Sequence, residues 1–259
     1  MEREKRGFTS PSKLKAAIVY VFMVFIGSTL LSILISMIVA SSRGLDANAV
    51  ASSFFDNSNA TKEIMDCQIV GQGYGNFLGY FISLAAIILW MRNDFITDYN
   101  SLMENKKKSF ILIPILAISF AGVAILIDYL FGLCIPESDN QSTIVSLLIS
   151  DARIPMILST VLFAPIVEEM IYRKAIFSVM RQFNLPLAYV TSIVLFSLPH
   201  MLSSSSSVGI WFLQLVPYAL CGGLLCFVYH ISGYNVYASI AAHMLNNLIA
   251  VILVLSRGF

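Results

Sequence analysis

Long apolar stretches recur along this chain and leave it few folds to adopt. Seven stretches have the length and composition of membrane spans, at roughly 16–40, 74–91, 109–131, 155–177, 186–202, 208–230 and 235–255. A helix needs about 20 mainly apolar residues to cross the hydrocarbon core of a bilayer. Spans of this kind fold as helices, because lipid cannot satisfy an open backbone. The sequence therefore predicts an all-α polytopic membrane protein, a bundle of about seven transmembrane helices with an intramembrane polar site.

The organisation along the chain follows from these stretches. We expect a basic cytoplasmic tail at 1–15, N-terminal transmembrane spans at 16–131, and a transmembrane core at 154–255. The first span is predicted to be a retained anchor, because its apolar run is much longer than the roughly 7–15 residues of a signal-peptide core. An apolar but short stretch at 144–150 leaves an eighth element open.

The charge of the chain favours a membrane and gives no sign of a nucleic-acid partner. Charged residues make up 12% of the 259 residues, against about 25% in soluble domains. The formal net charge is only +1, whereas nucleic-acid binding is typical of strongly basic domains.

The basic residues also predict an orientation. With the N-terminus inside, the inner segments hold twelve basic residues: Arg3, Lys5, Arg6, Lys13, Lys15, Arg92, Lys106, Lys107, Lys108, Arg173, Lys174 and Arg181. The outer segments hold four: Arg43, Lys62, Arg153 and Arg257. An excess of Lys and Arg marks the cytoplasmic side, so we expect the N-terminus to be cytoplasmic. The compact length and short loops favour a bacterial cell membrane.

Two adjacent glutamates lie inside the fourth apolar stretch. A charged side chain at the centre of a membrane helix costs roughly 2.5–3.5 kcal/mol on insertion scales, and such residues usually mark functional sites. Glu169 and Arg173 are four residues apart and share a helix face, as do Glu168 and Tyr172. Neighbouring residues point about 100° apart, so we predict that Glu169 neutralises Arg173. Glu168, without a local counter-ion, then faces the bundle as a candidate general base.

The glutamates also allow a structural interpretation, in which they form an ion network between helices with Arg173. The histidines of the later spans have similar pairs of interpretations. His200 follows Phe196 by one turn and is either part of a site or an interhelical hydrogen-bond donor. His243 and Asn247 share a face and suit an oxyanion hole, or serve as polar contacts between helices. Asn246 points elsewhere and is the weaker candidate.

Glu168, His200 and His243 are predicted to lie at similar depths in the membrane. At about 1.5 Å per residue, Glu168 lies about 20 Å from the outer end of its span, and His200 about 20 Å from the inner end of its span. His243 lies about 12 Å from the inner end of the last span. Within a hydrocarbon core of about 30 Å, all three fall in one middle layer. We therefore expect their side chains to converge on a cavity that water reaches from the inner face. His230, at the end of the sixth span, is predicted to be interfacial.

Three motifs at these positions resemble a known family. Glu-Glu-x-x-x-Arg at 168–173, Phe-x-x-x-His at 196–200 and His-x-x-x-Asn at 243–247 occur in this order, each in its own span. Together they are similar to the CPBP family, which comprises CAAX-type prenyl endopeptidases and bacteriocin-processing or self-immunity membrane proteins, regarded as intramembrane glutamic proteases. The resemblance covers roughly 154–255.

The resemblance implies a role for each matching residue. Glu168 matches the glutamate that activates water, and His200 the histidine that holds and polarises this water. His243 and Asn247 match the pair that stabilises the oxyanion. The implied reaction is hydrolysis of a peptide bond in a membrane-associated or lipidated peptide or protein, with no metal and no cofactor.

The supporting residues of the first motif are Glu169 and Arg173. The implied partners are the lipid bilayer and a peptide or protein substrate, with the oligomeric state left open.

Three rival interpretations stay open at this point. Glu168, His200 and His243 are the residue types of a His₂-Glu zinc site, although no His-Glu-x-x-His helix is present. Buried carboxylates and histidines also form proton relays in transporters, although the chain lacks an inverted repeat. The third is a binding role as a scaffold or bacteriocin-immunity protein, with the same motifs intact.

Overall fold

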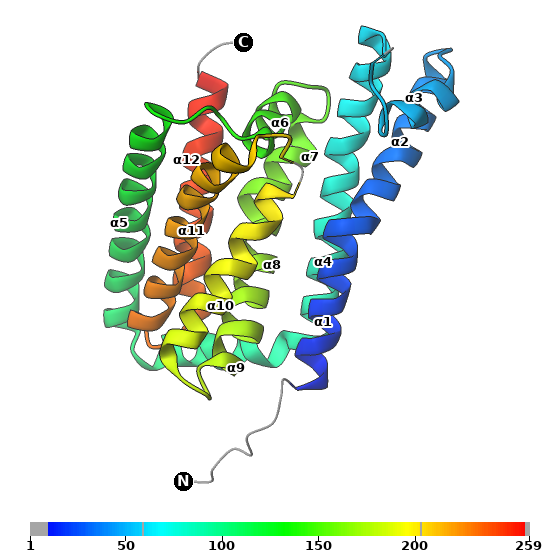
Figure 1. The fold of residues 1–259 in the computed structure, drawn as a ribbon. Helices are drawn as coiled ribbons and strands as arrows, with labels where there is room; N and C mark the ends of the chain where they lie inside the picture. Colours follow the sequence, from blue (N-terminus) through cyan, green and yellow to red (C-terminus); the bar gives the residue numbers. More distant parts are fainter. Residues whose placement is uncertain (1–9, 59, 203, 257–259) are drawn as a thin grey trace.

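The computed structural model describes residues 10–58, 60–202 and 204–256, and in this part of the chain all regular secondary structure is helical, with no strand. Figure 1 shows a bundle whose helices run between two faces. The described residues start at one face, with Ser10, and end at the other, with Ser256, and we call these the N-terminal and C-terminal faces. Six helices are long and apolar enough to cross a membrane, and Leu185–Met201 is a shorter apolar helix. The predicted all-α polytopic membrane fold is confirmed.

Successive spans run in opposite directions between the two faces, and several spans consist of consecutive helical segments. The following helical segments occur in chain order. They are α1 (Pro11–Phe22), η1 (Met23–Gly27), α2 (Ser28–Ser42), α3 (Ala47–Ser53), α4 (Lys62–Glu104), α5 (Lys106–Gly132), α6 (Asp139–Leu148), α7 (Arg153–Leu158), η2 (Ser159–Phe163), α8 (Ala164–Glu169), η3 (Met170–Phe177), α9 (Ser178–Met180), α10 (Leu185–Ser197), η4 (Leu198–Met201), α11 (Val208–Ile231) and α12 (Val236–Ser256). Three segments, η1, η2 and η3, are π-helical, and η4 is a 3₁₀ turn.

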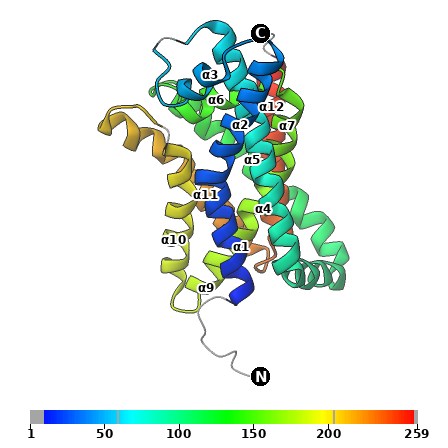
Figure 2. The same ribbon diagram turned by 90° about the vertical axis from the view of Figure 1, so that its right-hand side faces the viewer.

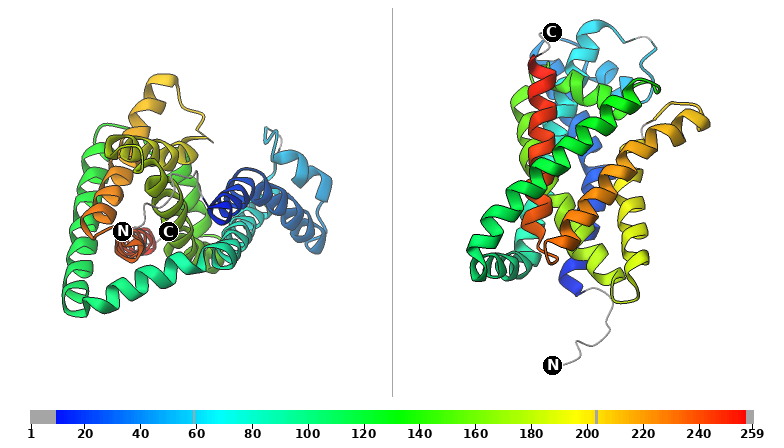
Figure 3. Two further views of the ribbon diagram at one scale, coloured as in Figure 1. Left: turned by 90° about the horizontal axis from the view of Figure 1, so that it is seen from below. Right: turned by 90° about the vertical axis from the view of Figure 1, so that its left-hand side faces the viewer.

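The second predicted span was much too short. The stretch 74–91 is only the middle of α4, which has 43 residues and would extend about 65 Å if it were straight. Both ends of α4 are polar, and a helix can continue into water because its hydrogen bonds are internal. The end of α4 bends and runs across the N-terminal face toward α5 (Figures 1 and 3).

The possible eighth element is the helix α6. Its ten residues extend only about 15 Å, which is too short to cross a membrane. It lies near the C-terminal face, beside α7 (Figure 1), so the alternation of the spans is unchanged.

The spans form two groups. Figures 1 and 3 show α1, α2 and α4 to one side of the remaining spans, and Figure 2 views the molecule from that side. Small residues allow α2 and α4 to approach closely, since three glycines on α4 face three serines on α2: Gly71, Gly75 and Gly79 against Ser28, Ser32 and Ser36.

Polar contacts fix the crosswise end of α4 to the second group. Asp98 receives a hydrogen bond from Lys174 Nζ at 2.6 Å and one from the backbone N–H of Val236 at 2.8 Å. The Asn235 amide donates to the Asp98 carbonyl at 2.8 Å. These contacts join α4, η3 and the start of α12, and so set the relative positions of the elements that carry the candidate site.

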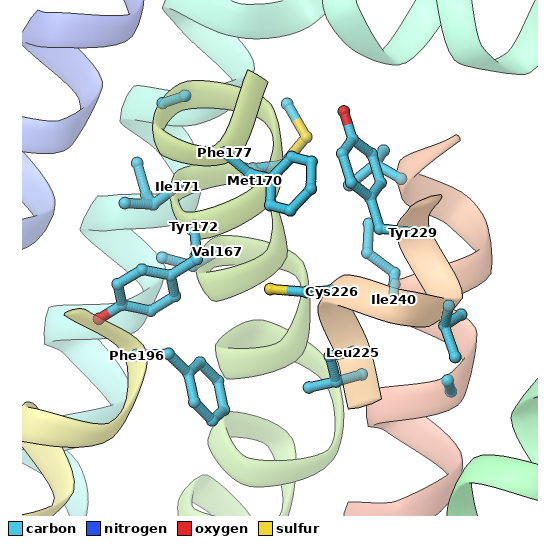
Figure 4. Packing of buried hydrophobic residues seen from close by; sticks show 14 of the residues in the cluster. Val167, Met170, Ile171, Tyr172, Phe177, Phe196, Leu225, Cys226, Tyr229 and Ile240 are labelled. Carbon is cyan, nitrogen blue, oxygen red and sulfur yellow. The ribbon is translucent and has the colours of Figure 1, made fainter. Parts of the chain in front are cut away.

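The hydrophobic core surrounds the span from α7 to α9. Figure 4 shows residues from this span packed against α10, α11 and α12. The rings of Tyr172 and Phe196 meet edge to face at 5.5 Å, and those of Phe177 and Tyr229 at 5.6 Å. The glutamate pair therefore lies on the helix that the other spans enclose.

Candidate active site

The helix that carries the glutamates is irregular on both sides of them. The segment α8 has π-helical η2 before it and π-helical η3 after it. Pro165 cannot donate a hydrogen bond to the residue four earlier, and its ring crowds that carbonyl. The wider π turn directly before α8 accommodates this, and such turns often occur at functional sites. The sequence pattern predicted neither π segment.

Glu169 and Arg173 form a buried ion pair. Arg173 Nε lies 3.0 Å from Glu169 Oε2, and both side chains are 0% exposed. The two atoms are close enough for an ion pair but do not have hydrogen-bond geometry. Arg173 also donates from Nη1 to Ser192 Oγ at 3.1 Å and from Nη2 to the Gly222 carbonyl at 3.5 Å. The predicted pairing of the two residues is present, and α10 and α11 complete the surroundings of the guanidinium.

Glu168 has a partner from a distant part of the chain. The Tyr80 hydroxyl on α4 donates to Glu168 Oε1 at 2.7 Å. The expected contact between Glu168 and Tyr172 does not form, because the Tyr172 hydroxyl bonds with that of Tyr20 at 3.0 Å. No basic side chain of its own helix pairs with Glu168 in the described residues, so the expectation of no local counter-ion is met.

His243 lies between the two glutamates. Its Nδ1 is 3.2 Å from Glu169 Oε1, and its Nε2 is 4.0 Å from Glu168 Oε2. The first contact is a hydrogen bond, and the second is wider than one. Since a hydrogen bond to water is about 2.8 Å long, a single water molecule can contact both atoms across the 4.0 Å gap. His243 itself is buried, with 7% of its surface exposed.

His200 approaches the same region from the short helix. Its Nδ1 lies 2.9 Å from the Phe196 carbonyl, and its ring stacks on Tyr218 with 4.7 Å between centroids. Phe196 lies between the two histidines, with its centroid 5.2 Å from that of His200 and 5.9 Å from that of His243. His200 is within electrostatic range of both Glu168 and His243.

The surroundings of the two histidines assign their tautomers. In each ring Nδ1 faces an oxygen atom, which is Phe196 O for His200 and Glu169 Oε1 for His243. The ring hydrogen is therefore on Nδ1 when the imidazole is neutral, and Nε2 presents a lone pair. Protonation of either ring adds a second donor at Nε2.

Asn247 contacts the helix of the glutamates rather than the histidine beside it. Its Nδ2 donates to the carbonyl of Thr160 in η2 at 2.8 Å, and its Oδ1 accepts from Asn246 at 3.4 Å. An amide group has two N–H donors, so one remains for another acceptor. The structure thus places all four residues of the implied catalytic set near α8, with Asn247 already tied to η2.

Tyr80 is the site residue that sequence reasoning missed. It belongs to an apolar stretch of the N-terminal spans, where a single tyrosine gives no local signal of function. In the described parts of the chain, no group of three or more His, Cys, Asp or Glu is arranged to hold a metal ion.

Comparisons with known proteins agree with the three motifs. A family model described as "Type II CAAX prenyl endopeptidase Rce1-like" matches residues 150–249. The chain is 33% identical over 158 residues to UPF0177 protein YajF of Lactococcus lactis subsp. lactis (strain IL1403), an alignment that covers 59% of this chain and 71% of that protein. No solved structure shows a significant match. The matched region contains all three motifs, and the chain belongs to the Rce1-like family of type II CAAX prenyl endopeptidases.

Proposed function

We propose that this protein is an intramembrane endopeptidase that hydrolyses a peptide bond of a membrane-associated or lipidated peptide with water activated by Glu168. The observation that carries the proposal is the buried arrangement of Glu168 Oε2 and His243 Nε2, which are 4.0 Å apart. A carboxylate and an imidazole at this separation can hold one water molecule between them. Membership of a family described as endopeptidases supports the same reaction.

The charges of the site support these roles. Glu169 and Arg173 neutralise each other, which leaves Glu168 and His243 as a second couple. The reaction requires that this couple carry one proton. When the proton is on His243, Nε2–H is a donor for a developing oxyanion, and Glu168 is a carboxylate that can accept a proton.

The reaction then proceeds in two steps. The water oxygen bonds to the scissile carbonyl carbon, and its proton passes to Glu168 while the carbonyl oxygen becomes an oxyanion. His243 and the second amide N–H of Asn247 stabilise this oxyanion. The carbon–nitrogen bond then breaks as Glu168 returns the proton to the leaving amine. His200, through Nε2, orients the attacking water.

The proposal includes an orientation and a location. The basic residues favour a cytoplasmic N-terminal face. A bacterial cell membrane is favoured by the compact chain and by the bacterial source of the relative YajF. The substrate would then reach the site from within that membrane or from its surface.

The test is hydrolysis of a library of prenylated and leader-type membrane peptides by purified protein in micelles. Wild type is compared with Glu168→Gln and with Glu104→Gln, a matched change at an exposed glutamate at the end of α4. We expect turnover that survives a chelator, vanishes in Glu168→Gln and persists in Glu104→Gln. Turnover that a chelator abolishes and zinc restores would support the zinc alternative. No turnover by well-folded wild type on any peptide would favour a binding role as a scaffold or immunity protein.

A further inference from the structure

Among the described residues of the N-terminal spans, Tyr80 is the one that donates a hydrogen bond to Glu168. Tyr80 lies on α4, outside the region 150–249 that the family model matches. Its hydroxyl is 2.7 Å from Glu168 Oε1, the short distance typical of an O–H group that donates to a carboxylate. Among residues 10–58, 60–202 and 204–256, no other hydrogen bond reaches the Glu168 side chain.

The contact makes the two oxygens of Glu168 unequal. Oε1 accepts the Tyr80 hydrogen bond, whereas Oε2 faces His243 Nε2 at 4.0 Å. Without a donor at Oε1, the carboxylate is free to rotate about its last torsion, which has a broad, roughly two-fold energy profile. Tyr80 therefore selects the carboxylate orientation that presents Oε2 to His243.

Two other buried tyrosine hydroxyls nearby bond to each other and not to Glu168. Tyr20 on α1 and Tyr172 on η3 bond to each other at 3.0 Å, and their rings meet edge to face at 5.9 Å. Tyr20 and Tyr80 thus come from the same group of N-terminal spans, lie close to each other and to Glu168, and differ in whether the hydroxyl reaches the carboxylate.

We propose that Tyr80 is a positioning residue for Glu168, one that fixes the carboxylate so that Oε2 alone receives the proton of the attacking water. This inference rests on the proposed function. It makes α4 part of the catalytic apparatus, although the sequence motifs of the family region do not include it.

The first experiment observes the contact without turnover. The protein is labelled with ¹³C at the glutamate side-chain carboxyl, and the infrared band of Glu168 is identified as the difference between wild type and Glu168→Gln. Tyr80→Phe removes the hydroxyl and keeps the ring, and we expect it to shift the Glu168 carboxylate band. Tyr20→Phe, the matched loss of a buried hydroxyl, should leave the band in place. An unchanged band in Tyr80→Phe would overturn the proposal.

The second experiment measures peptide hydrolysis by the same variants. A hydrogen bond to a charged group is worth about 1.5–3 kcal/mol, so Tyr80→Phe should lower kcat about 10–100-fold. We expect KM to stay within about two-fold, since a residue that orients the general base acts on the chemical step and not on substrate binding. Tyr20→Phe should keep the wild-type kcat. Equal losses in both variants would show a packing effect and overturn the positioning role.

The two experiments separate this inference from the proposed function. A shifted band in Tyr80→Phe with full turnover in Glu168→Gln would preserve the contact and refute the glutamate mechanism. Loss of turnover in Glu168→Gln with wild-type kcat in Tyr80→Phe would preserve the mechanism and refute the positioning role.

Discussion

At the scale of single residues, Arg173 is the largest side chain that is fully buried in the described part of the protein. The side chain is 0% exposed, and all three guanidinium nitrogens face an oxygen, on Glu169, Ser192 or the Gly222 backbone. The guanidinium also lies over the Phe196 ring, 5.1 Å from its centroid. Removing one partner of a buried ion pair leaves an uncompensated charge, which costs roughly 3–5 kcal/mol, whereas replacing both partners is often nearly neutral.

This asymmetry predicts the behaviour of a double-mutant cycle. Arg173→Met should destabilise the protein by roughly 3–5 kcal/mol, because Glu169 then stays buried without its cation. Glu169→Gln combined with Arg173→Met should recover part of that loss. The measurement is thermal unfolding in micelles for wild type, both single variants and the double variant. A double variant whose loss equals the sum of the two single losses would show that the pair is not coupled.

The two neighbouring asparagines of α12 give a second prediction. Asn247 donates to Thr160 O at 2.8 Å and has one further N–H for the oxyanion. Removing an oxyanion-hole donor costs about 10²–10³ in kcat, so Asn247→Ala should lower kcat by this order with little change in KM. Asn246→Ala is the matched control and should retain most of the wild-type kcat. Similar losses in both variants would indicate a disturbed helix instead of a lost donor.

Helix periodicity predicted the contact of Glu169 with Arg173 correctly but was wrong for Glu168 and Tyr172, which are also four residues apart. Glu169 and Arg173 pair because residues four apart share a face. The bonds from Tyr80 to Glu168 and from His243 to Glu169 join residues 88 and 74 positions apart. Such contacts depend on how the helices are placed around one another, which periodicity does not determine.

At the scale of helices, the interface between α2 and α4 depends on the absence of side chains. A Cβ atom added to Gly75 would lie 2.1 Å from Ser32 Oγ and 2.7 Å from the Ser28 carbonyl. At Gly71 it would lie 1.9 Å from Ser36 Oγ. Small residues allow such close approach in membranes, where helix association relies on packing because lipid is as apolar as the side chains.

The third prediction compares Gly75→Ala with Gly122→Ala. The first change overpacks the α2–α4 interface and should destabilise the protein by about 1–3 kcal/mol. Gly122 on α5 is exposed, and no atom lies within 4 Å of its added Cβ. Gly122→Ala should therefore leave thermal stability in micelles unchanged or raise it, since alanine favours helix by about 1 kcal/mol. A loss of stability at both positions would point to a general effect of the substitution.

Apolar length predicted where the chain crosses the membrane, but it did not predict how each helix ends or bends. It missed the polar ends of α4, because those residues form helix in water as well as in lipid. It also missed η2 and η3, because a π turn depends on the local crowding by Pro165 and on contacts with other spans. The spans and the three motifs were thus predictable from the sequence, whereas the elements that orient the glutamates were not.

At the scale of the whole molecule, charge separates the two faces. The N-terminal face carries the crosswise end of α4, the start of α5 and the end of the α7–α9 span (Figure 1), and these segments contain six of the basic residues: Arg92, Lys106, Lys107, Lys108, Lys174 and Arg181. Lys174 pairs there with Asp98 of α4 at 2.6 Å, and Lys13 of α1 pairs with Asp94 at 3.0 Å. Basic residues mark the cytoplasmic side largely irrespective of nearby acidic residues, so this pairing does not weaken the predicted orientation.

The orientation yields the fourth prediction, which uses a natural cysteine as a reporter. Cys134 is exposed between α5 and α6 at the C-terminal face, whereas Cys67 and Cys226 are buried. A membrane-impermeant maleimide should therefore label Cys134 in intact bacterial cells. The matched reporter is Ser101→Cys in a Cys134→Ser background, at an exposed position on the crosswise end of α4. It should react only after the membrane is permeabilised, because the positive-inside rule places this face in the cytoplasm. Peptide masses identify the labelled cysteine in each case. The reverse orientation, with the N-terminal face outside, would be shown by labelling of the Ser101→Cys variant in intact cells together with no labelling of Cys134 in the wild-type protein.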